Sequence, residues 1–342
     1  MDGALHETRE VQADARHDAS SNAEGNAMNT QRVKIRRIVE QTPEIRSFEL
    51  VPCDGSSVKF TPGDHIEVRV GDGLVRQYSL WNAPTDCDAY HIGVKRETNG
   101  RGGSVAMHAL NEGDEIEVGL PRNNFELRSD EGPVILIAGG IGITPVLAMA
   151  RHLQSVNRKC VLHLFARSAE HVPFKSELAT LDDAPIYLGL VPPTLNAVLT
   201  GILSDPPVDA RLYFCGPGPF MDLIEKLANN CGWKSDRVHL ERFSVDAATL
   251  ELDGDSFEVV LQKSGVTLTV EEDQTIIGAM EAAGLEPMTS CEQGVCGTCL
   301  TTVLEGEPDH RDLYLNPAEK ESGTLILPCV SRCKGKKLVL DL

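Results

Sequence analysis

The sequence predicts a multi-domain protein with a small antiparallel β-barrel, then an α/β unit with a parallel sheet, then an α+β unit. Residues 31–127 contain short alternating apolar runs separated by glycine and proline, which is typical of antiparallel strands. From residue 132 onward, continuous apolar strands alternate with helical patterns, which indicates a parallel sheet. Residues 256–342 combine a predicted hairpin, one helix and a closely spaced group of cysteines.

The chain of 342 residues is long enough for two or three domains that each bury their own core. We expect residues 1–29 to form a disordered tail, because they are nearly free of large apolar side chains. The barrel is predicted at residues 30–129 and the α/β unit at 130–246. A polar linker is expected at 247–255, and the α+β unit at 256–342.

The individual elements follow from local pattern. In the barrel, the alternating segment 65–70 predicts a strand. In the α/β unit, the apolar run 134–138 predicts a buried strand, followed by a glycine-rich turn and an apolar helix. Further strands of this unit are expected at 160–165 and 212–215.

The C-terminal unit begins with two short apolar runs, at 257–261 and 266–270, which predict a hairpin. Residues 274–283 predict a helix that ends at Gly284, since glycine readily takes the left-handed conformation that closes a helix. The cysteine-rich loop follows.

The charge of the chain limits its partners. There are 51 acidic and 32 basic residues, a net charge of −19, which argues against nucleic acid or an anionic membrane as partner. No apolar stretch of 18 residues is present, and the first 30 residues lack an apolar export segment. We therefore expect a cytoplasmic protein without a membrane span.

Four cysteines carry the strongest chemical signal. Cys291, Cys296 and Cys299 are followed by Cys329, which gives the C-x4-C-x2-C…C spacing of a plant-type [2Fe-2S] centre. We expect three thiolates on one tight loop and the fourth on a distant strand. A structural zinc site is the main alternative, but such sites usually show paired C-x2-C motifs, which this spacing fits poorly. The sequence thus predicts an electron carrier.

Two glycines in this loop support the cluster. Gly294 and Gly297 allow the backbone to wrap closely, so that its N–H groups can point at cluster sulfurs. The remaining cysteines are scattered without the spacing of a disulfide framework, and most are predicted to be reduced thiols; they are Cys53, Cys87, Cys160, Cys215, Cys231 and Cys333.

The barrel contains a polar strand that suits a flavin. In Arg76-Gln-Tyr-Ser-Leu80, alternation places Arg76 and Tyr78 on one face and Gln77 and Ser79 on the other. A flavin needs an aromatic ring, hydroxyl or amide groups and a cation, and all of these types are present. On these residues alone, an ordinary half-buried strand is the simpler interpretation.

A second barrel segment favours the flavin interpretation. Lys95, Arg96 and Arg101 surround a Gly-Gly-Ser turn at 102–104, and this turn opens a predicted helix at 105–110. Backbone N–H groups at such a turn and the neighbouring cations suit a phosphate.

Two glycine-rich turns indicate a nucleotide site. Residues 138–145 follow a buried strand and open a helix, with Pro145 in its first turn. Residues 214–219 end another strand and also open a helix. Two such turns at the carboxyl ends of strands in one sheet mark a ligand crevice. Cys215 and Phe243 are equally compatible with plain core packing.

The combination resembles the phthalate dioxygenase reductase family and is also close to vanillate demethylase reductases, over roughly residues 32–342. The matching segments are RQYSL at 76–80, GVKRETNGRGGS at 93–104, AGGIGITP at 138–145, CGPGPFMD at 215–222, the cysteine set, GEPDHRDLYL at 306–315, and VSR with the final LVLDL. The resemblance implies a flavin barrel, a nicotinamide domain and a β-grasp-like plant-type ferredoxin domain, in that order. This order and the phosphate turn resemble the FMN type rather than the FAD type.

The resemblance also implies roles for individual residues. Flavin ligands would be Arg76, Tyr78 and Ser79, with Val94, Lys95, Gly102, Gly103 and Ser104 around the phosphate. The nicotinamide nucleotide would contact Gly139, Gly140, Gly142, Gly216 and Pro217. Thr144, at the junction of the two cofactors, Cys215, near the nicotinamide, and Phe243, near the flavin ring, would serve catalysis.

Two positions depart from the family pattern. Gln77 stands where a relative carries a threonine that assists the flavin, and Cys333 stands where an alanine is expected. Cys333 follows Cys329 by four residues, so it raises the question of which thiol binds iron.

These features lead to one functional hypothesis. NADH supplies two electrons as hydride, the cluster accepts one at a time, and a flavin can divide the pair. The predicted protein is a reductase that passes electrons from NADH through FMN and [2Fe-2S] to a separate Rieske non-haem iron oxygenase, acting on an aromatic or similar acid. The alternatives are a reductase for a P450 or diiron oxygenase, and a redox sensor without turnover.

The preference for NADH over NADPH depends on the resemblance. After the second strand of the α/β unit, Arg167 and Ser168 suit a 2′-phosphate, whereas Glu170 would repel it.

Overall fold

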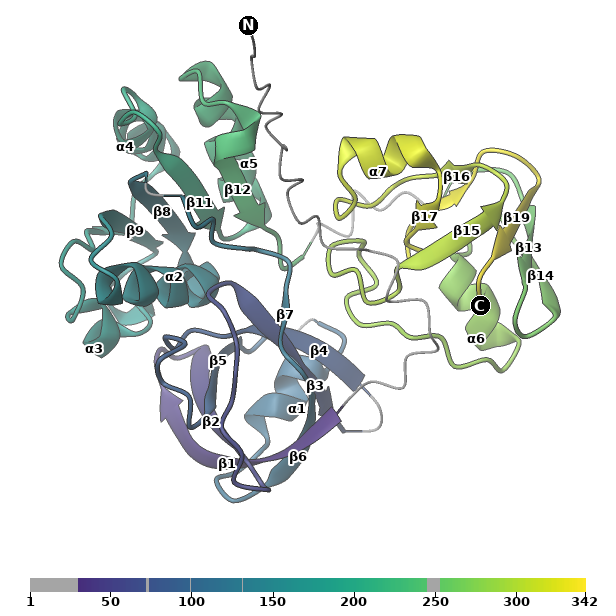
Figure 1. Ribbon diagram of the computed structural model, residues 1–342, viewed down its shortest axis with the longest axis horizontal. Helices are drawn as coiled ribbons and strands as arrows, with labels where there is room; N and C mark the ends of the chain where they lie inside the picture. The colour runs from purple at the N-terminus through teal and green to yellow at the C-terminus, as the bar shows by residue number, and fades with distance from the viewer. Residues whose placement is uncertain (1–29, 72–73, 99, 131, 245–252) are drawn as a thin grey trace, which may run out of the picture.

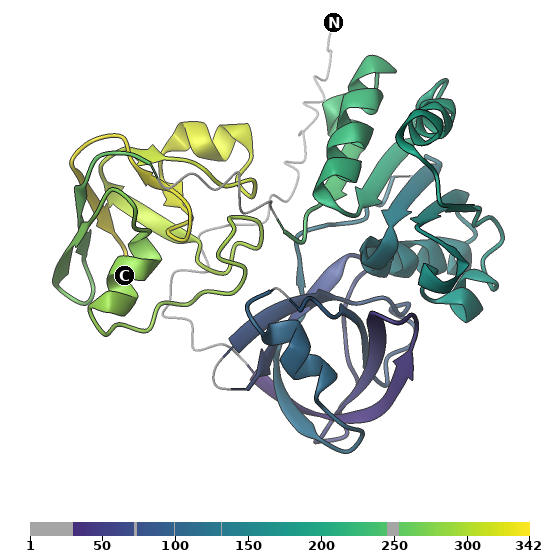
Figure 2. The same ribbon diagram turned by 180° about the vertical axis from the view of Figure 1, so that it is seen from behind.

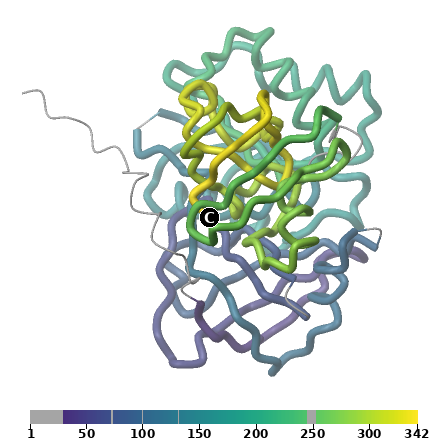
Figure 3. Tube along the Cα trace, turned by 90° about the vertical axis from the view of Figure 1, so that its right-hand side faces the viewer, coloured from purple at the N-terminus to yellow at the C-terminus, as the bar shows by residue number. Residues whose placement is uncertain are grey.

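A computed structural model describes residues 30–71, 74–98, 100–130, 132–244 and 253–342. Figures 1 and 2 show three bodies: a barrel-like sheet, a sheet covered by helices, and a smaller C-terminal body. In Figure 3 the C-terminal body faces the viewer and lies over the other two. The predicted tail at 1–29 and most of the predicted linker lie outside the described residues. No described helix is long and apolar enough to cross a membrane.

The first body is an antiparallel sheet in the order β4-β3-β6-β1-β2-β5, with β7 paired to β3. A bridge between Leu80 and Ile92 brings the two ends of this path together, so the sheet is nearly closed. Its interior is filled by buried apolar residues such as Val33, Phe48 and Ile66. The elements are β1 (Thr30–Glu40), β2 (Ile45–Pro52), β3 (Asp64–Val70), β4 (Leu74–Ser79), β5 (Tyr90–Lys95), α1 (Gly103–His108), β6 (Glu115–Gly119) and β7 (Arg122–Asn123).

The second body is a parallel sheet in the order β10-β9-β8-β11-β12. Chain order reverses between β8 and β11, so a crevice is expected at the carboxyl ends of these two strands. The strands are β8 (Val134–Gly139), β9 (Cys160–Ala166), β10 (Ile186–Leu188), β11 (Arg211–Cys215) and β12 (Val238–Glu241). The helices are α2 (Ile143–Ser155), α3 (Lys175–Leu178), α4 (Pro192–Leu203) and α5 (Gly218–Asn230), and short 3-10 turns are η2 (Gly140–Gly142), η3 (Ala169–His171) and η4 (Ser235–Arg237).

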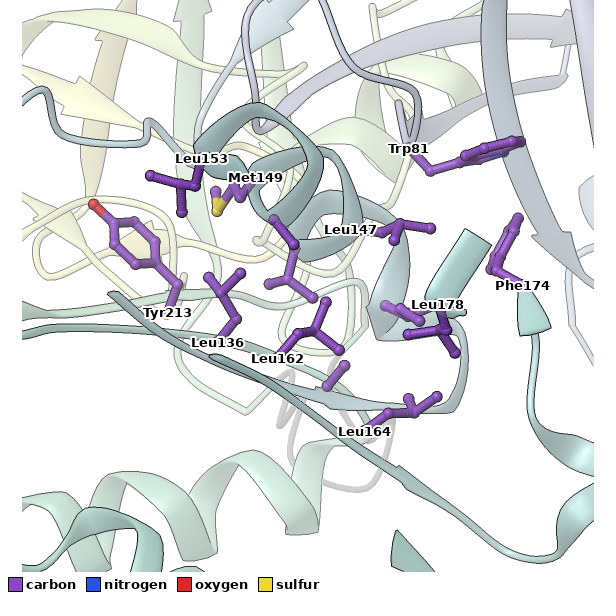
Figure 4. Close-up of a cluster of buried hydrophobic side chains, with 14 of the residues drawn as sticks. Trp81, Leu136, Leu147, Met149, Leu153, Leu162, Leu164, Phe174, Leu178 and Tyr213 are labelled. Carbon is purple, nitrogen blue, oxygen red and sulfur yellow. The ribbon is translucent and has the colours of Figure 1, made fainter. Parts of the chain in front are cut away.

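Helices cover both faces of this sheet, because its strands are apolar on both sides. On one face, Leu136, Leu162 and Leu164 pack against α2 and α3 (Figure 4). On the other face, Ile137 and Phe214 pack against α4 and α5. This two-sided burial explains the continuous apolar runs of the sequence.

The third body has a sheet in the order β14-β13-β19-β15-β17 and a small ladder of β16 and β18. Strands β13 and β19 are parallel, while the β13–β14 hairpin and the β15 pairs are antiparallel. The elements are β13 (Phe257–Leu261), β14 (Val266–Val270), α6 (Ile276–Ala282), β15 (Thr301–Glu305), β16 (Pro308–Asp309), α7 (Pro317–Ser322), β17 (Leu325–Ile326), β18 (Arg332–Cys333) and β19 (Lys337–Leu340).

Most predicted elements are present. The predicted hairpin strands match β13 and β14, and Gly284 has φ +77° after the helix, which is shorter than predicted because Thr275 caps it from outside. Helix α1 begins two residues before the predicted start. One expectation is wrong: Cys329 lies in the turn between β17 and β18, not on a strand.

Candidate functional site

A cleft of about 1210 Å³ lies where the three bodies meet. The polar barrel strand, both glycine-rich turns and the cysteine loop all reach it, although they are far apart in the sequence. Of the predicted site residues, the lining includes Arg76, Tyr78, Ser79, Lys95, Gly103, Ser104, Gly139, Gly140, Thr144, Gly216, Pro217, Phe243, Cys291 and Cys296.

The barrel side of the cleft carries the predicted flavin residues. Arg76 crosses Gly103 so closely that a Cβ at Gly103 would lie 2.6 Å from Arg76 Cγ, which explains glycine at this turn. Tyr78 lies beside it, and burial raises the pKa of its hydroxyl. Lys95 pairs with Glu97 at 2.5 Å, and the Ser104 hydroxyl accepts the Glu97 backbone N–H at 2.9 Å. The turn is thus a compact polar rim with two cations.

Two predicted phosphate residues do not line the cleft. The Val94 side chain is fully buried in the barrel core, and its backbone carbonyl contacts the His108 ring at 2.9 Å. Gly102 has φ +84°, a left-handed value that favours glycine, immediately before α1. Its contribution is therefore to turn geometry.

The two glycine-rich turns close the opposite side of the cleft. Gly139 and Gly216 approach each other so closely that a Cβ at Gly216 would lie 3.2 Å from the Gly139 backbone. Thr144 is buried at the start of α2, and its hydroxyl donates to the Ile141 carbonyl at 3.1 Å. Its methyl group would lie 2.9 Å from a Cβ at Gly93 of the barrel. Thr144 therefore lies at the junction of the barrel and the parallel sheet.

Gly142 and Cys215 lie behind this surface rather than on it. A Cβ at Gly142 would lie 2.4 Å from the Cys215 carbonyl oxygen, so glycine here allows α2 to pack on β11. Cys215 is fully buried, and burial raises the pKa of its thiol well above the usual 9.0. Phe243, in contrast, is 38% exposed on the cleft wall.

Glu241 is a cleft residue that the sequence analysis missed. It ends β12, and its carboxylate accepts a hydrogen bond from the Ser79 hydroxyl at 3.1 Å. Loss of hydration raises the pKa of this carboxyl to about 7 from 4.5. A carboxyl that titrates near neutrality beside a polar barrel strand can hold or release a proton there. No sequence pattern signals it, because Ser79 lies 162 residues away.

The cleft wall also carries an ion pair between two bodies. Arg167, after β9, donates to Glu44 of the barrel at 2.7 Å. Ser168 contacts the His171 ring at 2.8 Å, and the side chain of Glu170 is 71% exposed. Arg167, the cation that the sequence suggested as a 2′-phosphate ligand, is therefore already paired with Glu44.

The four cysteines form two pairs. Hydrogen bonding with Cys296 lowers the pKa of the Cys291 thiol to about 6, and that between Cys299 and Cys329 raises the pKa of Cys329. Within the described residues, no group of three or more His, Cys, Asp or Glu side chains is arranged around one metal position. Two thiol pairs fit the two irons of a [2Fe-2S] centre better than one tetrahedral zinc.

The loop around these cysteines has the conformation that glycine permits. Gly294 has φ +70° and Gly297 has φ +73°, and a Cβ at Gly297 would lie 2.3 Å from the Tyr314 ring. Backbone N–H groups of the loop point at sulfur, as that of Gln293 does toward Cys291 at 3.4 Å. The thiol of Cys333 instead contacts the Gly335 N–H at 3.3 Å and the Lys337 carbonyl at 3.5 Å. These contacts favour Cys329 as the fourth ligand.

The cysteine loop is held against the barrel. Arg101 donates to the Ser290 carbonyl at 3.0 Å and to that of Cys291, and it pairs with Glu292. Asn124 donates to the Cys296 carbonyl at 3.4 Å. The sequence indicated Arg101 as a phosphate residue but gave no sign of this contact, which joins residues almost 200 positions apart.

A cysteine loop, a nucleotide-type crevice and a polar barrel strand that share one cleft define an electron-transfer oxidoreductase. The 2Fe-2S iron-sulfur cluster binding domain family matches residues 259–334, which confirms the predicted cluster domain. The vanillate O-demethylase oxidoreductase of a Pseudomonas species, strain HR199, is 40% identical over 91% of this chain and 98% of its own length. The oxidoreductase NdmD of Pseudomonas putida is 41% identical over 89% of this chain, which spans 52% of that protein.

Solved structures agree. Phthalate dioxygenase reductase, described as a modular structure for electron transfer from pyridine nucleotides to [2Fe-2S], is 36% identical with TM-score 0.69, covering 92% of this chain and 98% of that one. An intact type IV self-sufficient cytochrome P450 monooxygenase is 33% identical with TM-score 0.78, and this chain covers 41% of it. The chain belongs to the phthalate dioxygenase reductase family. It is an oxidoreductase of the kind that serves oxygenase systems, as the sequence predicted.

Proposed function

We propose that this protein transfers electrons from NADH through FMN, bound in the barrel, and a [2Fe-2S] cluster, held by Cys291, Cys296, Cys299 and Cys329, to a separate Rieske non-haem iron oxygenase. The observation that carries the proposal is the shared cleft, which exposes the barrel strand, both glycine turns and two of the cysteines to one space. Bound flavin would divide the electron pair of a hydride, and the residues of the chain would bind, orient and shield it.

In this proposal each ligand has its own part of the cleft. Arg76 and the 102–104 turn supply cations and N–H groups for the flavin phosphate, and Tyr78 and Phe243 supply ring contacts. The turns at Gly139 and Gly216 suit the pyrophosphate of a nicotinamide nucleotide, because both end parallel strands at the reversal of strand order. Thr144 lies between the two sites.

The same proposal divides the chain into a flavin barrel at 30–129, a nicotinamide domain at 130–246, a linker at 247–255 and a cluster domain at 256–342. Its proposed setting is the cytoplasm, where thiols stay reduced. None of the ten cysteines forms a disulfide, and this includes the exposed Cys53 and Cys87.

Replacing single cysteines tests the path of the electrons. In Cys291→Ser or Cys329→Ser, the flavin and nicotinamide sites remain, so NADH should still reduce ferricyanide at close to the normal rate. Reduction of cytochrome c and of the oxygenase should fall at least about tenfold, because the cluster is lost.

The matched control for these variants is Cys333→Ser, because the Cys333 thiol contacts the Gly335 N–H and the Lys337 carbonyl, which lie close to it in the sequence. It should keep the visible cluster spectrum and full transfer. Loss of the cluster in Cys333→Ser with retention in Cys329→Ser would contradict the ligand assignment.

The flavin and the acceptor are tested separately. Heat release and chromatography should yield FMN, and recovery of FAD would contradict that part of the proposal.

The structural likeness to a self-sufficient P450 makes a P450 haem domain the second candidate acceptor. Purified Rieske and P450 components, each assayed for NADH-driven reduction, distinguish the two, and fast reduction of the P450 alone would overturn the Rieske assignment.

A further inference from the structure

Glu67 of β3 is a buried carboxylate in the interface between the barrel and the cysteine loop. Its side chain is 2% exposed, and Arg122 of β7 pairs with one of its oxygens at 2.5 Å. The other oxygen accepts a hydrogen bond from the Thr298 hydroxyl at 2.8 Å. Thr298 lies between two proposed cluster ligands, so a barrel carboxylate reaches the cluster loop directly.

Gln77 completes this contact from β4. Its side-chain amide donates to the Thr298 hydroxyl oxygen at 2.9 Å and to Glu67 at 3.2 Å. Gln77 is also one of the two positions at which the chain departs from the family pattern. The two barrel side chains therefore surround one hydroxyl group of the cluster domain.

The Thr298 hydroxyl also lies 3.4 Å from the sulfur of Cys296. In the loaded protein that sulfur is a thiolate, which can only accept hydrogen bonds. A threonine hydroxyl has a single hydrogen. It can donate this hydrogen to the Glu67 carboxylate or to the Cys296 sulfur, but not fully to both.

The geometry decides between the two acceptors. The charged oxygen of Glu67 at 2.8 Å is the closer and stronger acceptor, and Gln77 occupies the hydroxyl oxygen from the other side. While the cluster domain is docked, the hydrogen therefore points away from the cluster.

We infer that Glu67 and Gln77 are positioning residues that lower the reduction potential of the cluster by withholding the Thr298 hydrogen bond from Cys296. Hydrogen bonds to cluster sulfurs stabilise the more negative, reduced state, so their loss lowers the potential. A docked cluster is then a stronger reductant than an undocked one. Because the two equilibria are linked, reduction of the cluster weakens its docking on the barrel by the same factor.

This inference rests on the proposed cluster, and its test is an EPR-monitored redox titration of the purified holoprotein. In Glu67→Gln the amide is a weaker acceptor, so the hydroxyl turns toward sulfur and the midpoint potential should rise. Glu117→Gln is the matched control, because Glu117 also pairs with an arginine, Arg69 of β3 at 3.5 Å, on the same barrel. Its potential should equal that of the wild type.

Substitution of Thr298 separates two effects of Glu67 on the midpoint potential: the redirected hydrogen bond of the Thr298 hydroxyl and the through-space effect of the carboxylate charge. In Thr298→Val, most of the shift caused by Glu67→Gln should vanish, whereas in Thr298→Ser it should remain. A shift of full size in the valine background would overturn the inference, because the carboxylate would then act only through space. A lower potential in Thr298→Val alone would also overturn it, because the hydroxyl would already donate to sulfur.

The same EPR spectra distinguish failure of this inference from failure of the proposed function. If the wild type gives no [2Fe-2S] signal on reduction, the proposed function fails. If the signal is present and Glu67→Gln leaves the midpoint unchanged, only this inference fails.

Discussion

At the scale of single residues, the cleft depends on groups whose chemistry is set by neighbours from other parts of the chain. Glu241 is the clearest example. Its carboxyl is desolvated by burial, and it accepts a hydrogen bond from Ser79 of the barrel. Cys215 shows the converse. It was predicted to approach the nicotinamide, yet its thiol is fully buried and does not line the cleft.

The raised pKa of Glu241 predicts a pH-dependent stability. In the folded protein the carboxyl titrates near 7 rather than 4.5, so the fold favours its protonated form. This contribution is fully present below about pH 4.5 and is lost as pH rises through 7. Relative to Glu241→Gln, the wild type should therefore lose about 1–2 kcal/mol between pH 5 and pH 8, less than the full shift because solvent reaches the cleft.

Thermal unfolding of both proteins at pH 5, 6 and 8 measures this effect. Substitution of Glu126, an exposed acid of the barrel region paired with Arg128, by Gln serves as control and should show no such trend. A constant difference between the wild type and Glu241→Gln at all three pH values would mean that the carboxyl titrates normally.

At the scale of elements, Arg332 holds the cluster domain together. It is only 2% exposed and donates to three backbone carbonyls, those of Gln274 at 2.6 Å, Glu271 at 3.0 Å and Asp255 at 3.1 Å. Its guanidinium also lies 5.1 Å from the centre of the Phe257 ring. The side chain thus ties β18 to the start of β13 and to the segment between β14 and α6.

Arg332→Met should lower the free energy of unfolding of the cluster domain by about 2–4 kcal/mol, because three backbone carbonyls lose the charged donor that the buried Arg332 supplies. Differential scanning calorimetry of the holoprotein should show a lower transition for this domain. Lys336→Met, at an exposed position of the same region, should leave the transition unchanged. Equal behaviour of the two variants would show that the guanidinium contacts contribute little.

At the scale of the whole molecule, contacts between bodies tune each site. The pair of Glu44 and Arg167 joins the barrel to the nicotinamide side and neutralises a cation on the cleft wall. Burying a second anion beside Glu44 would be unfavourable, which supports the preference for NADH over NADPH.

Glu44→Gln should free Arg167 for a 2′-phosphate and raise the ratio of kcat/KM for NADPH to that for NADH about tenfold, the value of one charge-assisted hydrogen bond. Steady-state rates with both nucleotides measure the ratio. Glu40→Gln, which removes a barrel acid paired with Arg46 instead, should leave it unchanged. An unchanged ratio in Glu44→Gln would mean that Arg167 does not face the ribose.

The charge of the cluster domain predicts how the acceptor docks. Residues 254–342 hold 15 acidic and seven basic residues, a net charge of −8, which can steer a basic patch on the partner. Electron transfer to the oxygenase should slow as salt rises, since screening shortens to about 3 Å at 1 M. Equal stopped-flow rates at low and high salt would mean that the acidic surface does not steer the partner.

Local pattern by itself determined much of this protein. The alternating runs of the barrel, the apolar strands such as β8 and the C-x4-C-x2-C spacing follow from chemistry within a few residues, since period, turn residues and ligand geometry act over short distances. The role of Gly294 and Gly297 could be predicted for the same reason, because a tight cysteine loop requires the positive φ values that glycine readily adopts.

Only the tertiary structure decided the partners of polar side chains. Ser79 meets Glu241 across 162 positions, Arg167 meets Glu44 across 123, and Thr298 meets Glu67 across 231. Ser79 and Arg167 stood out in the sequence as ligand residues but not for these partners, and nothing in their own segments marks Glu241, Glu44, Glu67 or Thr298. Their chemistry arises because folding removes water and brings polar groups from different bodies within hydrogen-bond distance. No local stretch of sequence predicts that proximity.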